Sequence, residues 1–155
     1  MIAVHSIHKY GEGLSPEVME GLAVNGCSLV AVSSEKEHGE SARRNRWKNW
    51  TNAIKHASYH KGVFFGMDSD IVLVPCAPDI ALSTIKDYDI IIWKTSKNNM
   101  SHGFWGVKKK VVESIPMYWS GDNFCPICSW FAAATAAGYK ITYIDDPVLK
   151  HLKRR

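Results

Sequence analysis

The sequence lacks long hydrophobic runs, low-complexity segments and internal repeats. Its apolar stretches, such as residues 71–74 and 89–93, are far shorter than the roughly 20 residues that cross a bilayer, so we expect no transmembrane helix. The first residues, MIAVHSIHKYGEG, contain no basic leader and no small-residue cleavage site, and they do not resemble a signal peptide. We therefore expect a cytoplasmic protein.

Cysteine is also scarce, and four residues are too few for a disulfide scaffold in a chain of 155 residues. The hydrophobic content of 46% fits one globular domain over residues 1–155. The net charge of +4 arises largely in SARRNRWKNW, VKKKVV and the C-terminal HLKRR, and it suits an anionic partner such as phosphate, nucleic acid or a lipid headgroup. The aromatic residues are spread along the chain without a basic arm, which argues against nucleic acid.

Alternating strand-like and helix-like patterns predict an α/β fold. We first expect a strand, a helix, a strand, a basic helix and a strand at residues 2–7, 15–26, 27–34, 41–58 and 62–67. We then expect a helix, a strand, a polar loop, an edge-like strand, a helical turn, a helix and a strand at residues 77–85, 88–94, 95–103, 104–109, 111–116, 125–140 and 140–144. The third strand is apolar on both faces, so the sequence predicts three layers with helices on both sides of the sheet.

Two aspartates one residue apart, Asp68 and Asp70, follow this third strand in GVFFGMDSDIVLVP. Buried carboxylates are costly unless their charge is compensated, and open α/β sheets bind ligands at the carboxyl ends of their strands. In a continued strand both side chains would point to one face, with Ser69 pointing away, and both would reach one Mg²⁺ or Mn²⁺ ion. The simpler alternative is a hydrated surface turn, which the flanking apolar runs and the preceding basic helix disfavour.

The segment ARRNRWKNWTNAIKHASYHKGVFFGMDSDIVLVP resembles the nucleotide-binding half of GT-A fold glycosyltransferases, the nucleotide-diphospho-sugar transferases. In that family an Arg-Asn pair on a helix precedes a strand that ends in an Asp-x-Asp motif. The resemblance implies a three-layer, Rossmann-like GT-A fold with a mixed sheet, in which residues 1–75 form the nucleotide-binding half and residues 76–155 form the acceptor-side half and the basic tail. It also implies a hexosyltransferase-like enzyme that takes a sugar from a nucleoside-diphosphate sugar donor and depends on Mn²⁺ or Mg²⁺.

The same resemblance implies roles for individual residues. The metal would be held by Asp68, Asp70 and, near the C-terminus, His151, although a histidine in a basic tail is more simply explained as solvated. The donor would be contacted by Ser33, Arg44, Asn45, Asp68 and Ser69. For Ser33 the simpler explanation is that it ends a strand.

A base is needed to deprotonate the acceptor hydroxyl if the reaction inverts the anomeric carbon. YWSGDNFCP contains Asp122, which resembles the acidic residue that inverting family members carry before their acceptor-side helix. The usual Glu-Asp pair of the family is Gly121-Asp122 in this chain. An N-cap role for Asp122 at the helix that begins near Cys125 is an equally good interpretation.

Two other functions compete with glycosyl transfer. CPIC, residues 125–128, resembles the glutaredoxin-type site of a thiol-disulfide oxidoreductase, in which a helix N-terminus lowers a thiol pKa. Most of the chain precedes this motif, however, so two packing thiols or a structural disulfide are simpler explanations. A non-catalytic module that binds nucleic acid or a membrane surface through residues 43–48 is the other alternative, although the aspartate pair would repel phosphates unless a metal is bound.

The acceptor is not identified by the sequence and is a glycan, a protein or a lipid. Because the chain is short for the family, we expect an acceptor-binding part to come from a partner or from homo-oligomer formation. The tail KHLKRR suggests peripheral contact with an anionic membrane. A family member that binds the donor but does not catalyse transfer would have the same sequence features, so this alternative stays open.

Overall fold

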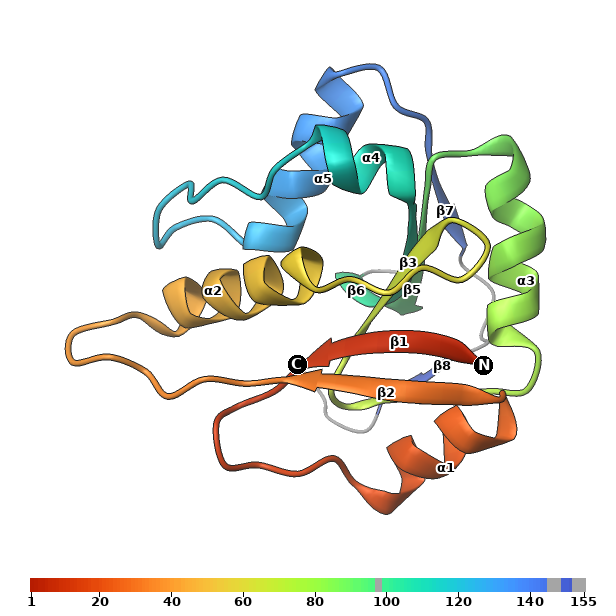
Figure 1. Ribbon diagram of the computed structural model, residues 1–155, viewed down its shortest axis with the longest axis horizontal. Coiled ribbons are helices and arrows are strands. Elements are labelled where there is room, and N and C mark those ends of the chain that lie inside the picture. Colours follow the sequence, from red (N-terminus) through yellow and green to blue (C-terminus); the bar gives the residue numbers. More distant parts are fainter. Residues whose placement is uncertain (97–98, 145–148, 152–155) are drawn as a thin grey trace.

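The structure, a computed structural model, describes residues 1–96, 99–144 and 149–151, with side chains described for residues 1–93 and 102–144. Strands and helices alternate over the first half of the chain (Figure 1). In chain order the elements are β1 (Ile2–Ile7), α1 (Pro16–Val24), β2 (Cys27–Val32), α2 (Ala42–Lys55), β3 (Val63–Asp68), β4 (Ile71–Leu73), α3 (Ala77–Thr84), η1 (Ile85–Asp87), β5 (Ile90–Ser96), β6 (Asn99–Lys108), α4 (Lys109–Ser114), α5 (Pro126–Ala136), β7 (Ile141–Ile144) and β8 (Leu149–His151). The predicted βαβαβ order is confirmed.

A six-stranded mixed sheet with the order β2-β1-β3-β6-β5-β7 forms the centre of the molecule. Strand β1 runs parallel to both β2 and β3, and β7 runs parallel to β5. Strand β6 is antiparallel to its neighbours β3 and β5. The short strands β4 and β8 form a separate antiparallel pair. The carboxyl ends of β1, β2 and β3 therefore meet at one edge of the sheet.

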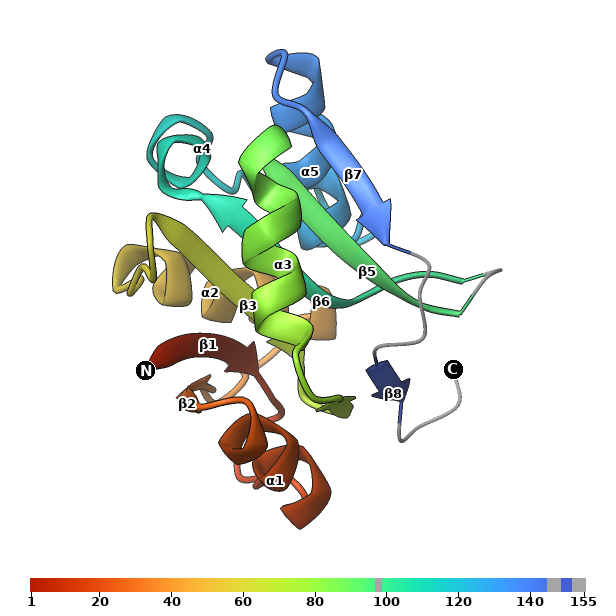
Figure 2. The same cartoon turned by 90° about the vertical axis from the view of Figure 1, so that its right-hand side faces the viewer.

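Helices cover both faces of this sheet, as the sequence predicts. One core packs α1 and α3 against strand residues that include Val4, Phe65 and Phe104. The other core packs α2, α4 and α5 against residues that include Phe64 and Trp105. In Figure 2 helix α3 lies in front of the strands, and α2 and α5 lie behind them. The molecule is a three-layer α/β fold.

The expected edge-like strand and the polar loop before it are corrected by the structure. Strand β6 begins at Asn99 and lies between β3 and β5, so it is an inner strand; residues 97 and 98 of the expected loop lie outside the described part. Phe104 packs into one core and Trp105 into the other. A Cβ atom at Gly66 would lie 2.1 Å from the Trp105 ring, so glycine in β3 is what admits this indole. The flanking lysines gave β6 the pattern of an edge strand, whereas its place is set by long-range pairing.

The helices are short and begin at residues that the sequence marks. The Ser15 hydroxyl accepts the Val18 N–H at 3.4 Å, and Pro16 occupies the first turn of α1, as expected. The Ser41 hydroxyl caps α2 by accepting the Arg44 N–H at 3.0 Å. In the part of the chain that the structure describes, every helix is too short or too polar to cross a membrane.

Candidate functional site

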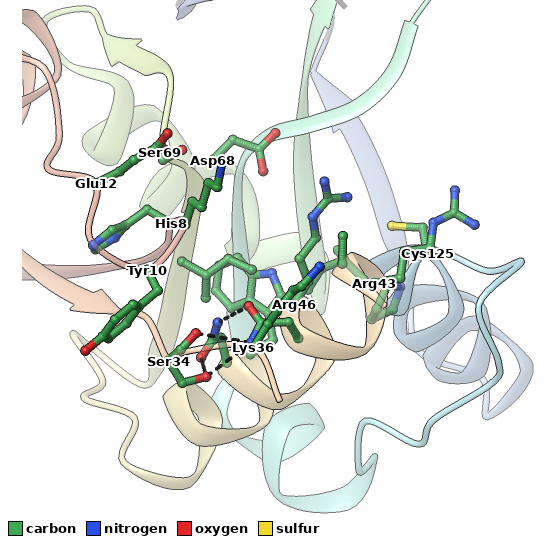
Figure 3. Close-up of a pocket in the computed structure, with 18 of the residues that line it drawn as sticks. His8, Tyr10, Glu12, Ser34, Lys36, Arg43, Arg46, Asp68, Ser69 and Cys125 are labelled. Carbon is green, nitrogen blue, oxygen red and sulfur yellow. Dashed lines mark hydrogen bonds between the residues drawn. The ribbon is translucent and has the colours of Figure 1, made fainter. Parts of the chain in front are cut away.

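A cavity of about 820 Å³ opens where the parallel strands β1, β2 and β3 end. Its walls are formed by the residues that follow these strands, by one side of α2 and by the start of α5 (Figure 3). This volume lies within the range of sites that hold small molecules or cofactors, about 300 to 1,000 Å³. The position agrees with the rule that open α/β sheets bind ligands at the carboxyl ends of their strands.

Two residues of the Asp-Ser-Asp motif, Asp68 and Ser69, line this cavity. Asp68 is the last residue of β3 and pairs in register with Ile7 of β1, and its half-buried side chain lines the cavity together with Ser69. The strand ends at Asp68, as predicted, and does not continue through the motif, because Ser69 and Asp70 form a turn into β4. The Asp70 side chain is 3% exposed and does not line the cavity. The two carboxylates are therefore not presented by a common strand face, which corrects the reason given for their pairing.

The backbone brings the C-terminal histidine close to this turn. In the pairing of β4 with β8, His151 lies opposite Ile71, the residue that follows Asp70. The side chain of His151 and the tail beyond it lie outside the described part of the chain. Among described residues no group of three or more His, Cys, Asp or Glu side chains is arranged around a metal position. The metal role of Asp68, Asp70 and His151 stays a prediction.

Helix α2 presents one basic side to the cavity. Its lining residues form two rows with steps of three and four residues, which are Ala42, Asn45 and Asn49, and Arg43, Arg46 and Trp50. Arg44 does not line the cavity; its guanidinium lies 4.5 Å from the Trp47 ring centre and 5.0 Å from that of Trp119. Adjacent helical residues point about 100° apart, so Arg44 and Asn45 face different directions. The arginines at the cavity are thus Arg43 and Arg46.

Asn45, a predicted donor-binding residue, ties α2 to the end of β2. Its side-chain amide donates to the Ser34 carbonyl at 3.2 Å, and the Ser34 hydroxyl donates to Asn49 Oδ1 at 2.8 Å. Asn49 Nδ2 closes the ring by donating to Asn45 Oδ1 at 3.2 Å. Ser34 lines the cavity, whereas the predicted Ser33 is half-buried behind it. This network fixes the orientation of α2 relative to the strand ends.

The predicted base, Asp122, lies in the loop before α5 and is exposed. Its carboxylate accepts a hydrogen bond from the Ser41 hydroxyl, and its carbonyl accepts one from Arg43 Nη1 at 2.9 Å. The N-cap of α5 is Cys125, so the alternative interpretation of Asp122 as that cap is wrong. Asp122 instead joins its loop to the start of α2 and does not itself line the cavity.

Several cavity residues follow β1 and were not predicted as site residues. They are His8, Lys9, Tyr10 and Glu12. The signal for them was present, because the first strand of a βαβ unit ends at the same edge as the next parallel strands. Lys36, in the loop after β2, was missed in the same way and adds an ammonium group beside Arg43 and Arg46 (Figure 3).

A second group of reactive side chains occupies the wall at the start of α5. Cys125 and Cys128 line the cavity together with His102 of β6. The His102 Nε2 atom lies 3.0 Å from the Cys128 sulfur. Burial lowers the pKa of His102 to about 4, so its imidazole is neutral at pH 7. The CPIC motif therefore forms part of the cavity wall.

Comparisons with known proteins identify the fold. No protein-family model matches the sequence, and no characterised protein is similar to it in sequence. Among solved structures, A197 from STIV has a TM-score of 0.68 and 14% identity over 99% of this chain and 87% of its own. A glycosyltransferase involved in glycosylation of the major capsid of PBCV-1 has a TM-score of 0.61 and 14% identity over 99% and 94% of the two chains.

A third similar structure is an animal enzyme with known ligands. The catalytic domain of Drosophila β1,4-galactosyltransferase 7, in complex with xylobiose, has a TM-score of 0.64 and 13% identity over 100% of this chain and 72% of its own. A mutant of that enzyme was solved with manganese, UDP-Gal and xylobiose. At these identities the similarity establishes the architecture. The protein has the GT-A fold of nucleotide-diphospho-sugar transferases.

Proposed function

We propose that this protein is a glycosyltransferase that takes a sugar from a nucleoside-diphosphate donor with the help of Mn²⁺ or Mg²⁺. The observation that carries the proposal is the cavity in which the Asp68-Ser69 end of β3 faces the basic side of α2. A carboxylate and several cations around one cavity suit a ligand that contains both a diphosphate and hydroxyl groups. The GT-A fold supports the same conclusion.

The basic side of α2 would bind the diphosphate. Arg43 and Arg46 present guanidinium groups to the cavity, and Lys36 adds an ammonium group. Arginine forms bidentate hydrogen bonds to phosphate oxygens, each charge-assisted bond contributing about 1.5 to 3 kcal/mol. Because α2 is fixed by the Asn45–Ser34–Asn49 network, these cations are held in place before the donor binds.

The residues near the β3 end fit a hard divalent cation by their chemistry. Carboxylates suit Mg²⁺ or Mn²⁺. The β4–β8 pairing, which sets His151 opposite Ile71, supports including this histidine with Asp68 and Asp70. A bound divalent cation supplies positive charge that stabilises the departing nucleoside diphosphate. In this proposal Asp68 and Ser69 also orient the donor from the floor of the cavity.

Asp122 is our proposed base for the acceptor hydroxyl. The Ser41 hydroxyl and Arg43 hold its loop against the first turn of α2, which carries the cavity cation Arg43. A carboxylate at this place would receive the acceptor proton from the open side of the cavity. The acceptor is a glycan, a protein or a lipid, and an added subunit would complete its binding site.

Calorimetric titration tests the donor site. UDP, GDP, ADP, CDP and their sugar derivatives are titrated into the protein in MnCl₂ and in EDTA. We expect one nucleotide to bind with Mn²⁺, to bind much more weakly in EDTA, and to lose its metal dependence in Asp68→Ala. Asp87→Ala removes an exposed carboxylate that does not line the cavity and serves as the matched control for charge. If no nucleotide binds to the folded wild-type protein, the proposal is wrong.

Catalysis is tested separately with the donor that binds. Release of free nucleoside diphosphate from this donor, in the presence of candidate glycans, reports transfer. We expect Asp122→Asn to bind the donor as the wild type does and to release product at least about 100-fold more slowly, as for loss of a general base. Binding with no release from any acceptor would identify a donor-binding protein that does not catalyse transfer.

A further inference from the structure

The cavity wall contains two thiols for which glycosyl transfer has no use. Cys125 is the N-cap residue of α5, and Cys128 lies in the first turn of the same helix. Both are free thiols, both line the cavity, and their sulfur atoms share a hydrogen bond. The Cys-Pro-Ile-Cys spacing thus brings two oxidisable sulfurs together at one accessible helix end.

The surroundings make the two thiols unequal. The hydrogen bond from Cys128, followed by the N–H groups of Cys128 and Ile127 and the charge of Arg43, outweighs burial and lowers the pKa of Cys125 to about 6. The same bond and burial raise the pKa of Cys128. Cys125 is therefore largely thiolate at pH 7, and the thiolate is the form that attacks a disulfide. Figure 3 shows Arg43 and Cys125 on the same side of the cavity.

His102 provides a base for the second sulfur. Its Nε2 atom lies 3.0 Å from the Cys128 sulfur, and its ring packs edge-on against Phe131 at 5.1 Å. Burial keeps the imidazole neutral, so in the tautomer with the proton on Nδ1 the Nε2 atom can accept the proton of Cys128. Once Cys125 is part of a mixed disulfide and no longer a thiolate, His102 is the neighbouring acceptor for this proton.

We propose that Cys125 and Cys128 form a redox-active dithiol that exchanges with low-molecular-weight disulfides entering through the cavity. The Cys125 thiolate attacks one sulfur of the disulfide RSSR, which breaks the S–S bond and releases one thiolate RS⁻. Cys128 then gives its proton to His102 and attacks the Cys125 sulfur, which expels the second RS⁻. One RS⁻ group takes up the Cys128 proton from His102, and the other takes up the proton that Cys125 had released to water, so RSSR is reduced to two RSH while the dithiol becomes a disulfide.

The other two cysteines, Cys27 and Cys76, lie in surroundings that differ from those of Cys125 and Cys128. Cys27 is buried, and burial, with a smaller effect of Asp79, raises its pKa to about 11. Cys76 is exposed and lies before α3, outside the cavity. Neither of them lines the cavity or shares the contact of Cys128 with His102. The proposed exchange goes beyond glycosyl transfer and does not depend on it.

Mass spectrometry after incubation with oxidised glutathione tests the proposal on the full chain. Every variant also carries Cys76→Ser, which removes the exposed thiol outside the motif. The protein that carries Cys76→Ser alone is the reference. In this reference we expect the loss of two hydrogens, through a Cys125–Cys128 disulfide, and no glutathione adduct. In Cys128→Ser we expect one glutathione on Cys125, because the mixed disulfide cannot be resolved. In Cys125→Ser we expect no adduct on Cys128.

His102→Ala tests the proton acceptor. We expect the glutathione adduct on Cys125 to form as in the reference and to convert to the disulfide at least about tenfold more slowly, as for loss of a general base. Circular dichroism checks that each variant is folded. The proposal is overturned if both thiols persist in the reference, if independent adducts form on Cys125 and Cys128, or if the thiols react only after a chelator removes a bound metal.

Discussion

Two aspartates at opposite ends of the sheet have opposite surroundings. Asp89 precedes β5 and is 9% exposed; its carboxylate lies 2.9 Å from Lys110 Nζ and accepts the Lys140 N–H at 2.8 Å. Asp68 ends β3, is half-buried, and lines a cavity that arginines also line. The first carboxylate connects loops around the sheet, whereas the second faces space for a ligand. Charge near a strand end therefore has a structural use at one edge and, in our proposal, a binding use at the other.

The largest effect is expected when the cavity carboxylate is removed. Asp68→Ala should weaken Mn²⁺-dependent nucleotide binding about 100-fold, which corresponds to about 2.7 kcal/mol. The stability of the fold should change little, since the side chain is half-buried at the rim of the sheet. Calorimetry measures the binding, and urea unfolding measures the stability. If Asp68→Ala bound nucleotide normally but unfolded more easily, Asp68 would have the structural role that we assign to Asp89, and the prediction would be wrong.

The same substitution at the other end should affect stability and spare binding. Asp89→Ala removes the acceptor of the Lys140 N–H and the partner of Lys110 and Lys108. We expect the free energy of unfolding to fall by about 2 kcal/mol, because the partly buried Lys140 N–H loses its hydrogen bond to a carboxylate. Urea denaturation checks this value. If nucleotide affinity fell in parallel, the two edges would not be independent.

Two arginines on α2 sharpen the comparison within one helix. Arg46→Gln removes a cation from the cavity and should weaken nucleotide binding about tenfold, whereas Arg44→Gln should leave binding within about twofold. Arg44 stacks on Trp47 and Trp119, so its loss should instead cost about 0.5 to 1 kcal/mol of stability. Parallel titrations of the two variants measure this difference. Equal losses of affinity would restore the original assignment of Arg44 to the donor.

The smallest expected effect is a pH dependence at Asp89. Burial alone would raise its pKa, but the Lys140 N–H and Lys110 outweigh burial and hold the pKa below its ordinary value of 3.8. A lowered folded pKa means that the stabilisation is fully present above the unfolded pKa and disappears as the pH falls through the folded one. The difference in unfolding free energy between wild type and Asp89→Ala should therefore shrink only in acid, below the unfolded pKa. A difference that stayed constant into strong acid would exclude the ionic contribution.

Local patterns in the sequence were sufficient for most of the fold. The βαβαβ order, the Ser15 cap and the end of β3 at Asp68 follow from periodicity and capping chemistry, which act over a few residues. The inner position of β6 in the sheet does not follow from such local patterns, because its pairing with β3 joins segments that are far apart in the chain. Lysines at the end of β6 made its sequence resemble that of an edge strand.

Three of the predicted donor-binding residues line one cavity, and the other predicted donor-binding residues lie elsewhere. Asp68, Ser69 and Asn45 line the cavity as a donor-binding role requires, but the motif turns after Asp68 and buries Asp70. The choice of Arg44 followed a sequence pair from a resemblance, whereas the rotation of α2 decides which arginine faces the cavity. His8 to Tyr10 were missed because they have no motif and come to the site only through parallel pairing of β1.

The most direct test of the central claim is paramagnetic relaxation by Mn²⁺ in the nucleotide complex. In NMR spectra of the labelled protein with the bound nucleoside diphosphate, Mg²⁺ is replaced by Mn²⁺ and the loss of amide signals is mapped. We predict that signals of Asp68, Ser69 and the first turns of α2 disappear, while those around Asp89 and Lys140 remain sharp. Broadening centred at the Asp89 end, or no localised broadening at all, would contradict a metal-dependent donor site at the carboxyl ends of the strands.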